Sequence, residues 1–85
     1  MNRHEATTIG RFRLGHRTIE AATEGGGTVW IKRVHPDPEM ELGCIVQIDT
    51  ATPRLRLYLA EWDDTTREEA KERAKQLWLR HRAAA

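Results

Sequence analysis

The chain lacks serine entirely and contains a single cysteine, Cys44, among its 85 residues. Without serine there can be no Gly-x-Ser-x-Gly nucleophile motif. One cysteine cannot form a disulfide within the chain or a cysteine-rich zinc site, so we expect a reducing compartment. Cys44 stands in an apolar run, which favours an inert buried thiol over a catalytic nucleophile.

Long hydrophobic runs and a large excess of charge are also missing. No segment approaches the about 20 apolar residues of a membrane span, and Met1–Thr8 lacks the apolar region of a signal peptide. We therefore expect a cytoplasmic protein that does not bind a membrane. The net charge of +1 is too small to predict nucleic-acid binding by itself. Eleven of the fourteen basic residues are arginines, which suit bidentate contacts with phosphates and carboxylates.

Signatures of catalysis and of metal binding are absent from the sequence as well. The chain has four histidines, His4, His16, His35 and His81. They follow no metal-site or triad spacing, and neither an HExxH motif nor a phosphate-binding loop occurs. The triplet Gly25–Gly27 precedes a predicted strand, whereas a phosphate cradle needs a helix N-terminus. We expect no enzyme, no catalytic residue and no cofactor.

An acidic stretch after the third predicted strand is the nearest approach to a cation site. Asp37, Glu39 and Glu41 alternate as in a calcium loop, but the interleaved prolines favour a solvated turn. We therefore expect no metal.

The C-terminal part of the chain carries the clearest helix signal, and we predict a helix over residues 65–82. Thr65 and Thr66 each precede a glutamate by three residues, which is the spacing of a capping box. One stripe at helical spacing should pack against a sheet: Ala70, Ala74, Leu77, Trp78 and His81. Leu79 lies on the opposite side and should face solvent or a partner. Trp62 should staple the start of the helix to the sheet.

Ahead of the helix, alternating apolar and polar residues predict four or five antiparallel strands within residues 8–61. The expected strands are 8–14, 17–23, 28–34, 43–49 and 54–61. Residues 17–23 would also tolerate a helical turn, and residues 1–7 should fray. The sequence therefore predicts one domain over residues 1–85, of the α+β class, with an antiparallel meander covered on one face by a single C-terminal helix.

The last predicted strand decides which side chains face the helix. Leu55, Leu57 and Leu59 should pack under the apolar stripe, so the residues between them point away from it. The same alternation in the other strands puts seven cationic or aromatic residues on the outer side: Arg11, Arg13, Trp30, Lys32, Arg54, Arg56 and Tyr58. We predict that these seven residues form a partner-binding site.

Two interpretations of this outer side stand. It can bind a partner, because Trp, Tyr and Arg are frequent hot-spot residues. It can also be a solvated sheet surface with cross-strand pairs to Glu20 and Asp49. The exposure of Trp30 distinguishes the two interpretations.

The run from Leu57 to Ala70, Leu-Tyr-Leu-Ala-Glu-Trp-Asp-Asp-Thr-Thr-Arg-Glu-Glu-Ala, resembles part of three-strand-plus-helix DNA-binding domains. These include the plant ethylene-response (apetala-type) domains and the arm-binding domains of phage integrases. In those families, arginines and tryptophans of the exposed sheet face enter the major groove. The resemblance implies DNA contacts by Arg11, Arg13, Trp30, Lys32, Arg54 and Arg56. The chain departs from the family in its low net charge and in lacking a Trp-Gly-Lys-Trp-like strand.

The size, the alternating strands and the Thr-Thr-Arg-Glu-Glu-Ala…Leu-Trp helix also resemble small phage and mobile-element inhibitors of the anti-CRISPR kind. Many of these are single domains with a curled antiparallel sheet and one helix. They typically have no active site and occupy a surface on a nucleoprotein complex.

We therefore expect a non-enzymatic interaction module, encoded by a phage or mobile element, that binds and sterically blocks a macromolecular (nucleoprotein) complex. The alternative is a small DNA-binding domain that reads DNA with the arginine and tryptophan face of its sheet. A homodimer through paired sheets or helices is a third hypothesis, because so short a chain buries a modest core and leaves strand edges open.

Overall fold

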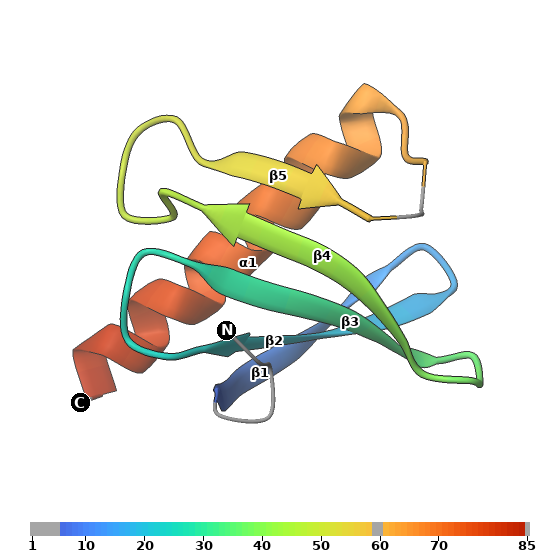
Figure 1. The fold of residues 1–85 in the computed structure, drawn as a ribbon, viewed down its shortest axis with the longest axis horizontal. Coiled ribbons are helices and arrows are strands. Elements are labelled where there is room, and N and C mark those ends of the chain that lie inside the picture. The colour runs from blue at the N-terminus through green and yellow to red at the C-terminus, as the bar shows by residue number, and fades with distance from the viewer. Residues whose placement is uncertain (1–5, 59–60, 85) are drawn as a thin grey trace.

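Strands and helix follow one another along the chain as a meander. The computed structural model describes residues 6–58 and 61–84. Its elements are β1 (Thr7–Leu14), β2 (Arg17–Thr23), β3 (Val29–His35), β4 (Met40–Val46), β5 (Arg54–Leu57) and α1 (Asp64–Ala84). The strands are antiparallel and neighbour one another in sequence order, and α1 crosses behind β4 and β5 in Figure 1. The described residues confirm the α+β class, with a five-stranded meander and one C-terminal helix.

The β1–β2 hairpin turns through Gly15 and His16. Gly15 adopts a φ of 66°, a left-handed conformation that glycine reaches without steric cost. Leu14 faces Arg17 across the turn, and the pairing continues to the far ends of both strands. Residues 17–23 are therefore a strand, and the helical-turn alternative is wrong.

Two glycines lie at irregularities of the sheet where a side chain would not fit. The β1–β2 register shifts next to Gly10, and the β3–β4 register shifts close to Gly43. A Cβ on Gly10 would lie 2.6 Å from a methyl carbon of Leu77 in α1, and a Cβ on Gly43 would overlap the backbone carbonyl of Arg56 in β5. Gly10 therefore lets the helix approach β1, and Gly43 lets β5 approach β4.

Sheet and helix share one apolar core. Its buried residues alternate along β1, β2 and β3, shift across the irregularity in β4, and recur at helical spacing in α1. They are Phe12, Leu14, Ile19, Ala21, Val29, Ile31, Leu42, Ile45, Ile48 (after β4), Leu55, Ala70, Ala74 and Trp78. Leu77 packs against this cluster from a half-buried position. His81, predicted to share the stripe, is exposed because the last turns of α1 extend past the sheet (Figure 1).

The predicted leucine row is observed in part. Leu55 is buried and Leu57 is half-buried against the core, whereas Leu59 lies outside the described residues. Trp62 also packs against the core, and the guanidinium of Arg17 lies 5.9 Å from its ring centroid. This packing agrees with the staple expected before the helix.

Basic side chains of α1 bind backbone carbonyls at the rim of the sheet. Arg67 donates to the carbonyl of Leu55 in β5 at 3.0 Å, and Lys75 donates to the carbonyl of Thr50 in the β4–β5 loop at 2.8 Å. These hydrogen bonds hold the helix against the edge strand, where carbonyls would otherwise need water. Within residues 6–58 and 61–84, no helix combines the length and apolar composition needed to cross a membrane.

β4 and β5 differ from their predicted bounds by several residues, whereas β1 begins one residue earlier and β3 begins and ends one residue later. β4 spans Met40–Val46 rather than 43–49, because it already pairs with β3 at Met40 and ends where Gln47 adopts a φ of 56°. Thr50 closes the turn that follows, donating both its N–H and its hydroxyl to the Gln47 carbonyl. β5 ends at Leu57 rather than at residue 61. At the other end of the chain, Thr7 belongs to β1, and residues 1–5 of the expected frayed segment lie outside the described ranges.

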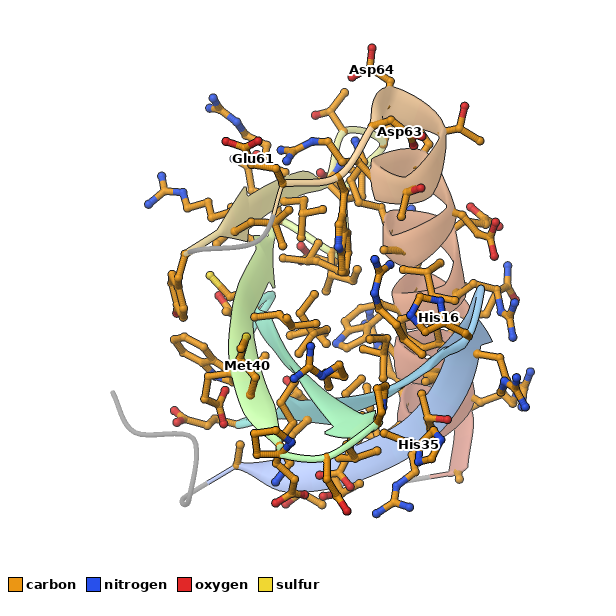
Figure 2. All side chains as sticks on the ribbon, turned by 90° about the vertical axis from the view of Figure 1, so that its right-hand side faces the viewer. His16, His35, Met40, Glu61, Asp63 and Asp64 are labelled. Atoms are coloured by element: carbon orange, nitrogen blue, oxygen red, sulfur yellow. The ribbon has the colours of Figure 1, made fainter. Side chains whose placement is uncertain are left out.

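Asp63 caps the N-terminus of α1 (Figure 2). Its Oδ1 accepts a hydrogen bond from the Thr66 N–H at 2.7 Å, and its carbonyl accepts one from the Arg67 N–H at 3.0 Å. The predicted cap at Thr65 or Thr66 is therefore wrong: aspartate is a better N-cap than threonine, and the sequence places both here. Hydrogen bonds from Thr66 lower the pKa of the Asp63 carboxyl.

We expect Gly43→Ala to lower the free energy of unfolding by about 2–4 kcal/mol, because the added methyl must displace the β5 backbone. Urea denaturation followed by circular dichroism measures the change. Gly26→Ala is the matched control, since a Cβ there meets no atom within 4 Å. Equal losses in both variants would contradict the role of Gly43.

Asp63→Ala should lower Tm at pH 7, and Thr65→Ala should lower it less. The folded pKa of Asp63 is lowered, so its stabilising contribution is present above the unfolded value of about 3.9 and is lost as pH falls through the folded pKa. The Tm difference between wild type and Asp63→Ala should therefore shrink as pH is lowered below the unfolded pKa of about 3.9. Thermal melts across the acid range measure it, and a constant difference would argue against an ionised cap.

Candidate interaction surface on the outer sheet face

The sheet face opposite α1, the outer face, carries the seven predicted site residues. Paired residues of antiparallel strands project to the same side of a sheet. Two rows across the strands result, one of Arg11, Glu20, Lys32 and Glu41, the other of Ala22, Trp30, Cys44 and Arg56. Arg13 and Arg54 lie two positions from Arg11 and Arg56 in the same strands, and Tyr58 follows Arg56 by two. The backbone therefore places all seven side chains away from the helix.

Charges alternate along the first row, the charge row, and neutralise one another. Arg11 Nη2 lies 3.0 Å from Glu20 Oε2, and Lys32 Nζ lies 3.8 Å from Glu20 Oε1. Lys32 also lies 3.4 Å from Glu39 Oε1. Glu20 is only 8% exposed and is thus a carboxylate buried between two cations. The expected cross-strand pair with Glu20 is confirmed, so Arg11 and Lys32 are already engaged within the protein.

Arg54 and Arg56 in β5 are exposed cations. They pair in the ladder with Val46 and Cys44, and no carboxylate of the described residues lies within ion-pair distance of either. Tyr58, which is 55% exposed, takes the next outward position. Their guanidinium groups can donate paired hydrogen bonds to a carboxylate or a phosphate of another molecule.

Cys44 lies beneath these side chains, buried on the outer face and outside the apolar core. Burial raises the pKa of its thiol, and the charge of Arg56 and a hydrogen bond with Tyr58 oppose this only in part. Burial also raises the pKa of the Tyr58 hydroxyl, and nearby Cys44 and Glu41 add to that rise. At neutral pH, Cys44 is therefore a protonated, poorly nucleophilic thiol and Tyr58 a neutral phenol.

Trp30 is half-buried. A fully buried Trp30 would have favoured a solvated sheet surface and a fully exposed one a partner-binding site, so its exposure does not decide between the two interpretations. It lies opposite Ala22 on β2 and Cys44 on β4. The structure thus brings Trp30, Arg54, Arg56 and Tyr58 to the β3–β5 side of the outer face, which we call the arginine-aromatic patch. Arg11 and Arg13 lie on the far edge strand, where the Arg13 carbonyl accepts a hydrogen bond from Arg73.

Asp49 does not lie on the outer face as predicted. It lines a pocket of about 410 Å³ between the β2–β3 loop and the end of α1, together with Trp78, His81 and Arg82. Its predicted pairing with an outer-face cation is wrong because β4 ends at Val46, so the strand alternation does not reach Asp49.

The remaining candidate ligands are dispersed. His16 and His35 lie at the end of the sheet that carries the β1–β2 and β3–β4 turns (Figure 2). Within the part of the chain that the structure describes, no three His, Cys, Asp or Glu residues gather closely enough to hold a metal ion. Glu39 of the acidic turn instead pairs with Lys32, and His4 lies outside the described residues.

Sequence reasoning missed Glu24. It lines a pocket of about 180 Å³ with Gly26, Thr28 and Trp30. Its Oε1 atom is buried and has no hydrogen-bond partner. The sequence did contain a signal, because Glu24 continues the alternation of β2 one position beyond the buried Thr23, which places it toward the outer face.

Comparison of the chain with protein-family models, with curated proteins and with solved structures finds no match. The five-stranded meander also differs from the three-stranded sheet that the resemblance to DNA-binding domains implied. The functional argument therefore rests on the chemistry of the outer face, where guanidinium groups can bind anions and aromatic rings can pack against a partner.

Glu20→Gln should lower the free energy of unfolding by about 1–3 kcal/mol, because Arg11 and Lys32 would lose the carboxylate between them at a site shielded from water. Glu39→Gln is the control: its pair with Lys32 is exposed, and its loss should cost under about 1 kcal/mol. Chemical denaturation measures both. Equally small effects would show that the charge row does not stabilise the sheet.

Proposed function

We propose that this chain is a non-enzymatic binding module whose arginine-aromatic patch occupies a surface of a macromolecular complex and blocks it sterically, as inhibitors of the anti-CRISPR kind do. One observation carries the proposal. Arg54 and Arg56 are exposed without a carboxylate partner among the described residues, and they lie beside Tyr58 and the half-buried Trp30.

The patch has the composition and the rigidity that interfaces use. Arginine, tyrosine and tryptophan dominate interface hot spots, since they combine large contact area with directed hydrogen bonds. Trp30, Arg54 and Arg56 project from paired strands, so the backbone that carries them is already ordered before a partner binds. Binding therefore costs little backbone entropy on this side of the interface. The neighbouring charge row is neutralised internally, which limits nonspecific attraction to polyanions.

The size of the molecule also suits a complete interface. It measures about 31 by 26 Å along its two longest axes, sheet and helix together. A standard protein–protein interface buries about 800 Å² on each partner. A partner of ordinary footprint would therefore cover most of the outer face, including the arginine-aromatic patch and part of the charge row.

A DNA-binding domain is the second candidate, and the same two exposed arginines favour it, since neither has a carboxylate partner in residues 6–58 and 61–84. Counterion release makes nucleic-acid binding weaken steeply with salt, by about 0.9 log units per log unit of salt for each phosphate neutralised. An interface anchored by aromatic residues changes little. Titrations between about 50 and 200 mM salt, with a mixed-sequence DNA duplex and with the captured partner, separate the two functions.

Replacing Arg54 and Arg56 together by alanine should abolish capture of the partner from host lysate, because both guanidinium groups lose their contacts. Arg80→Ala is the matched control, since it removes an exposed arginine from the helix side. Affinity capture followed by mass spectrometry measures retention, and circular dichroism verifies the fold of each variant. Unchanged capture by the double variant would exclude this face as the binding surface.

A further inference from the structure

A pocket lies at the end of the molecule where the β2–β3 and β4–β5 loops meet the last turns of α1 (Figure 1). Its volume of about 410 Å³ falls within the about 300–1,000 Å³ that is usual for small-molecule sites. The two loops and the helix contribute Gly25, Gly26, Gly27, Asp49, Trp78, His81 and Arg82 to its lining. His81 and Asp49, whose predicted positions on the helix stripe and on the outer face are wrong, therefore meet in this pocket.

The walls of the pocket are fixed before any ligand binds. The hydroxyl of the buried Thr23 donates to the Thr28 carbonyl at 2.9 Å and holds the β2–β3 loop in shape. The Ile48 N–H donates to the Gly27 carbonyl at 2.9 Å, which joins the two loops. A Cβ on Gly27 would lie 2.9 Å from Asp49 Oδ1, so a glycine at this position leaves room for the carboxylate against the loop. A ligand would thus meet a largely preformed site.

The pocket carries charges of both signs that do not neutralise each other. Asp49 is exposed, and within residues 6–58 and 61–84 neither an ion pair nor a hydrogen bond engages its carboxylate. Arg82 likewise has no carboxylate partner in those ranges. Its guanidinium lies 5.2 Å from the ring centroid of Trp78, and this contact holds the cation at the pocket wall.

This arrangement selects against a ligand of a single charge. An anion is attracted by Arg82 and repelled by Asp49, and a cation experiences the reverse. A ligand with one charge of each sign is attracted by both residues. The His81 imidazole lines the same pocket and offers a further hydrogen-bonding group, because one ring nitrogen or the other can donate.

We propose that this pocket binds a small zwitterion that carries an ammonium and a carboxylate, as a free amino acid does. The ammonium binds the Asp49 carboxylate and the carboxylate binds the Arg82 guanidinium, both through charge-assisted hydrogen bonds. The carbon skeleton lies against the Trp78 indole, which forms the most buried aromatic wall of the pocket. The inference goes beyond the proposed function, since no residue of the arginine-aromatic patch lines this pocket.

Titration with glycine, γ-aminobutyrate and ε-aminocaproate, three zwitterions with increasing charge separation, tests the pocket. The backbone amide signals of residues 25–27 in NMR spectra report binding. We expect a saturable shift with at least one of the three, with a dissociation constant on the order of 1 mM. The amide and the N-acetyl derivative of that compound each lack one charge and should bind about tenfold more weakly or less. No saturable shift with any of the three, or an equal affinity for either derivative, would overturn the inference.

Two variants remove one charge of the pocket at a time. Asp49→Asn and Arg82→Gln should each weaken binding of the zwitterion about tenfold. Asp49→Asn should not weaken binding of the N-acetyl derivative, because that compound has no ammonium to lose. Glu72→Gln and Arg80→Gln are the matched controls, since they remove exposed charges of α1 that do not line the pocket, and should leave the affinity unchanged. Circular dichroism verifies the fold of each variant. An unchanged affinity in either pocket variant, or an equal loss in its control, would overturn the assignment.

Discussion

The contact between α1 and one face of the sheet determines what the rest of the molecule can do. Ala70 and Ala74 let the helix approach the strands, Gly10 leaves room for Leu77, and Trp78 supplies the largest buried side chain of the helix. One helix covers only one face of a five-stranded sheet. The opposite face must therefore be compatible with water or with a partner, and it carries the seven predicted site residues.

Glu20 and Glu24, two of the glutamates on the outer face, differ in how their carboxylates are satisfied. Glu20 lies between Arg11 and Lys32 and neutralises both. Glu24 has a buried oxygen without a hydrogen bond, and Arg54 and Arg56 have no carboxylate nearby among the described residues. The first arrangement uses charge to hold strands together. The second leaves two guanidinium groups available, which is the physical basis of the proposed interface with a protein.

Much of the fold followed from local pattern, and the errors lie where local pattern is ambiguous. Alternation in residues 54–57 identified the inward leucines and the outward arginines correctly. The strand predicted at 43–49 lies three residues beyond the observed β4. Gln47 ends β4 by adopting a left-handed conformation, and a hydrophobicity pattern does not reveal that conformation. The helix cap was misassigned because several adjacent residues are good caps. Glu24 was missed because a glycine triplet beside it suggested a flexible loop, while Thr23 holds that loop in shape.

Period-two alternation, turn glycines and a helical stripe are local properties, so the sequence alone determined the α+β class, the order of strands and helix, and the side of the sheet on which the arginines lie. Whether the sheet has four or five strands was decided by the pairing of β2 with its neighbours. Tertiary structure decided which of those arginines are neutralised. Pairing of β1 with β2 and of β2 with β3 brought Glu20 to Arg11 and Lys32, whereas β5, at the other edge, brought no acid to Arg54 and Arg56. Ion pairing depends on distances between residues remote in sequence, and those distances exist only once the strands have found their register.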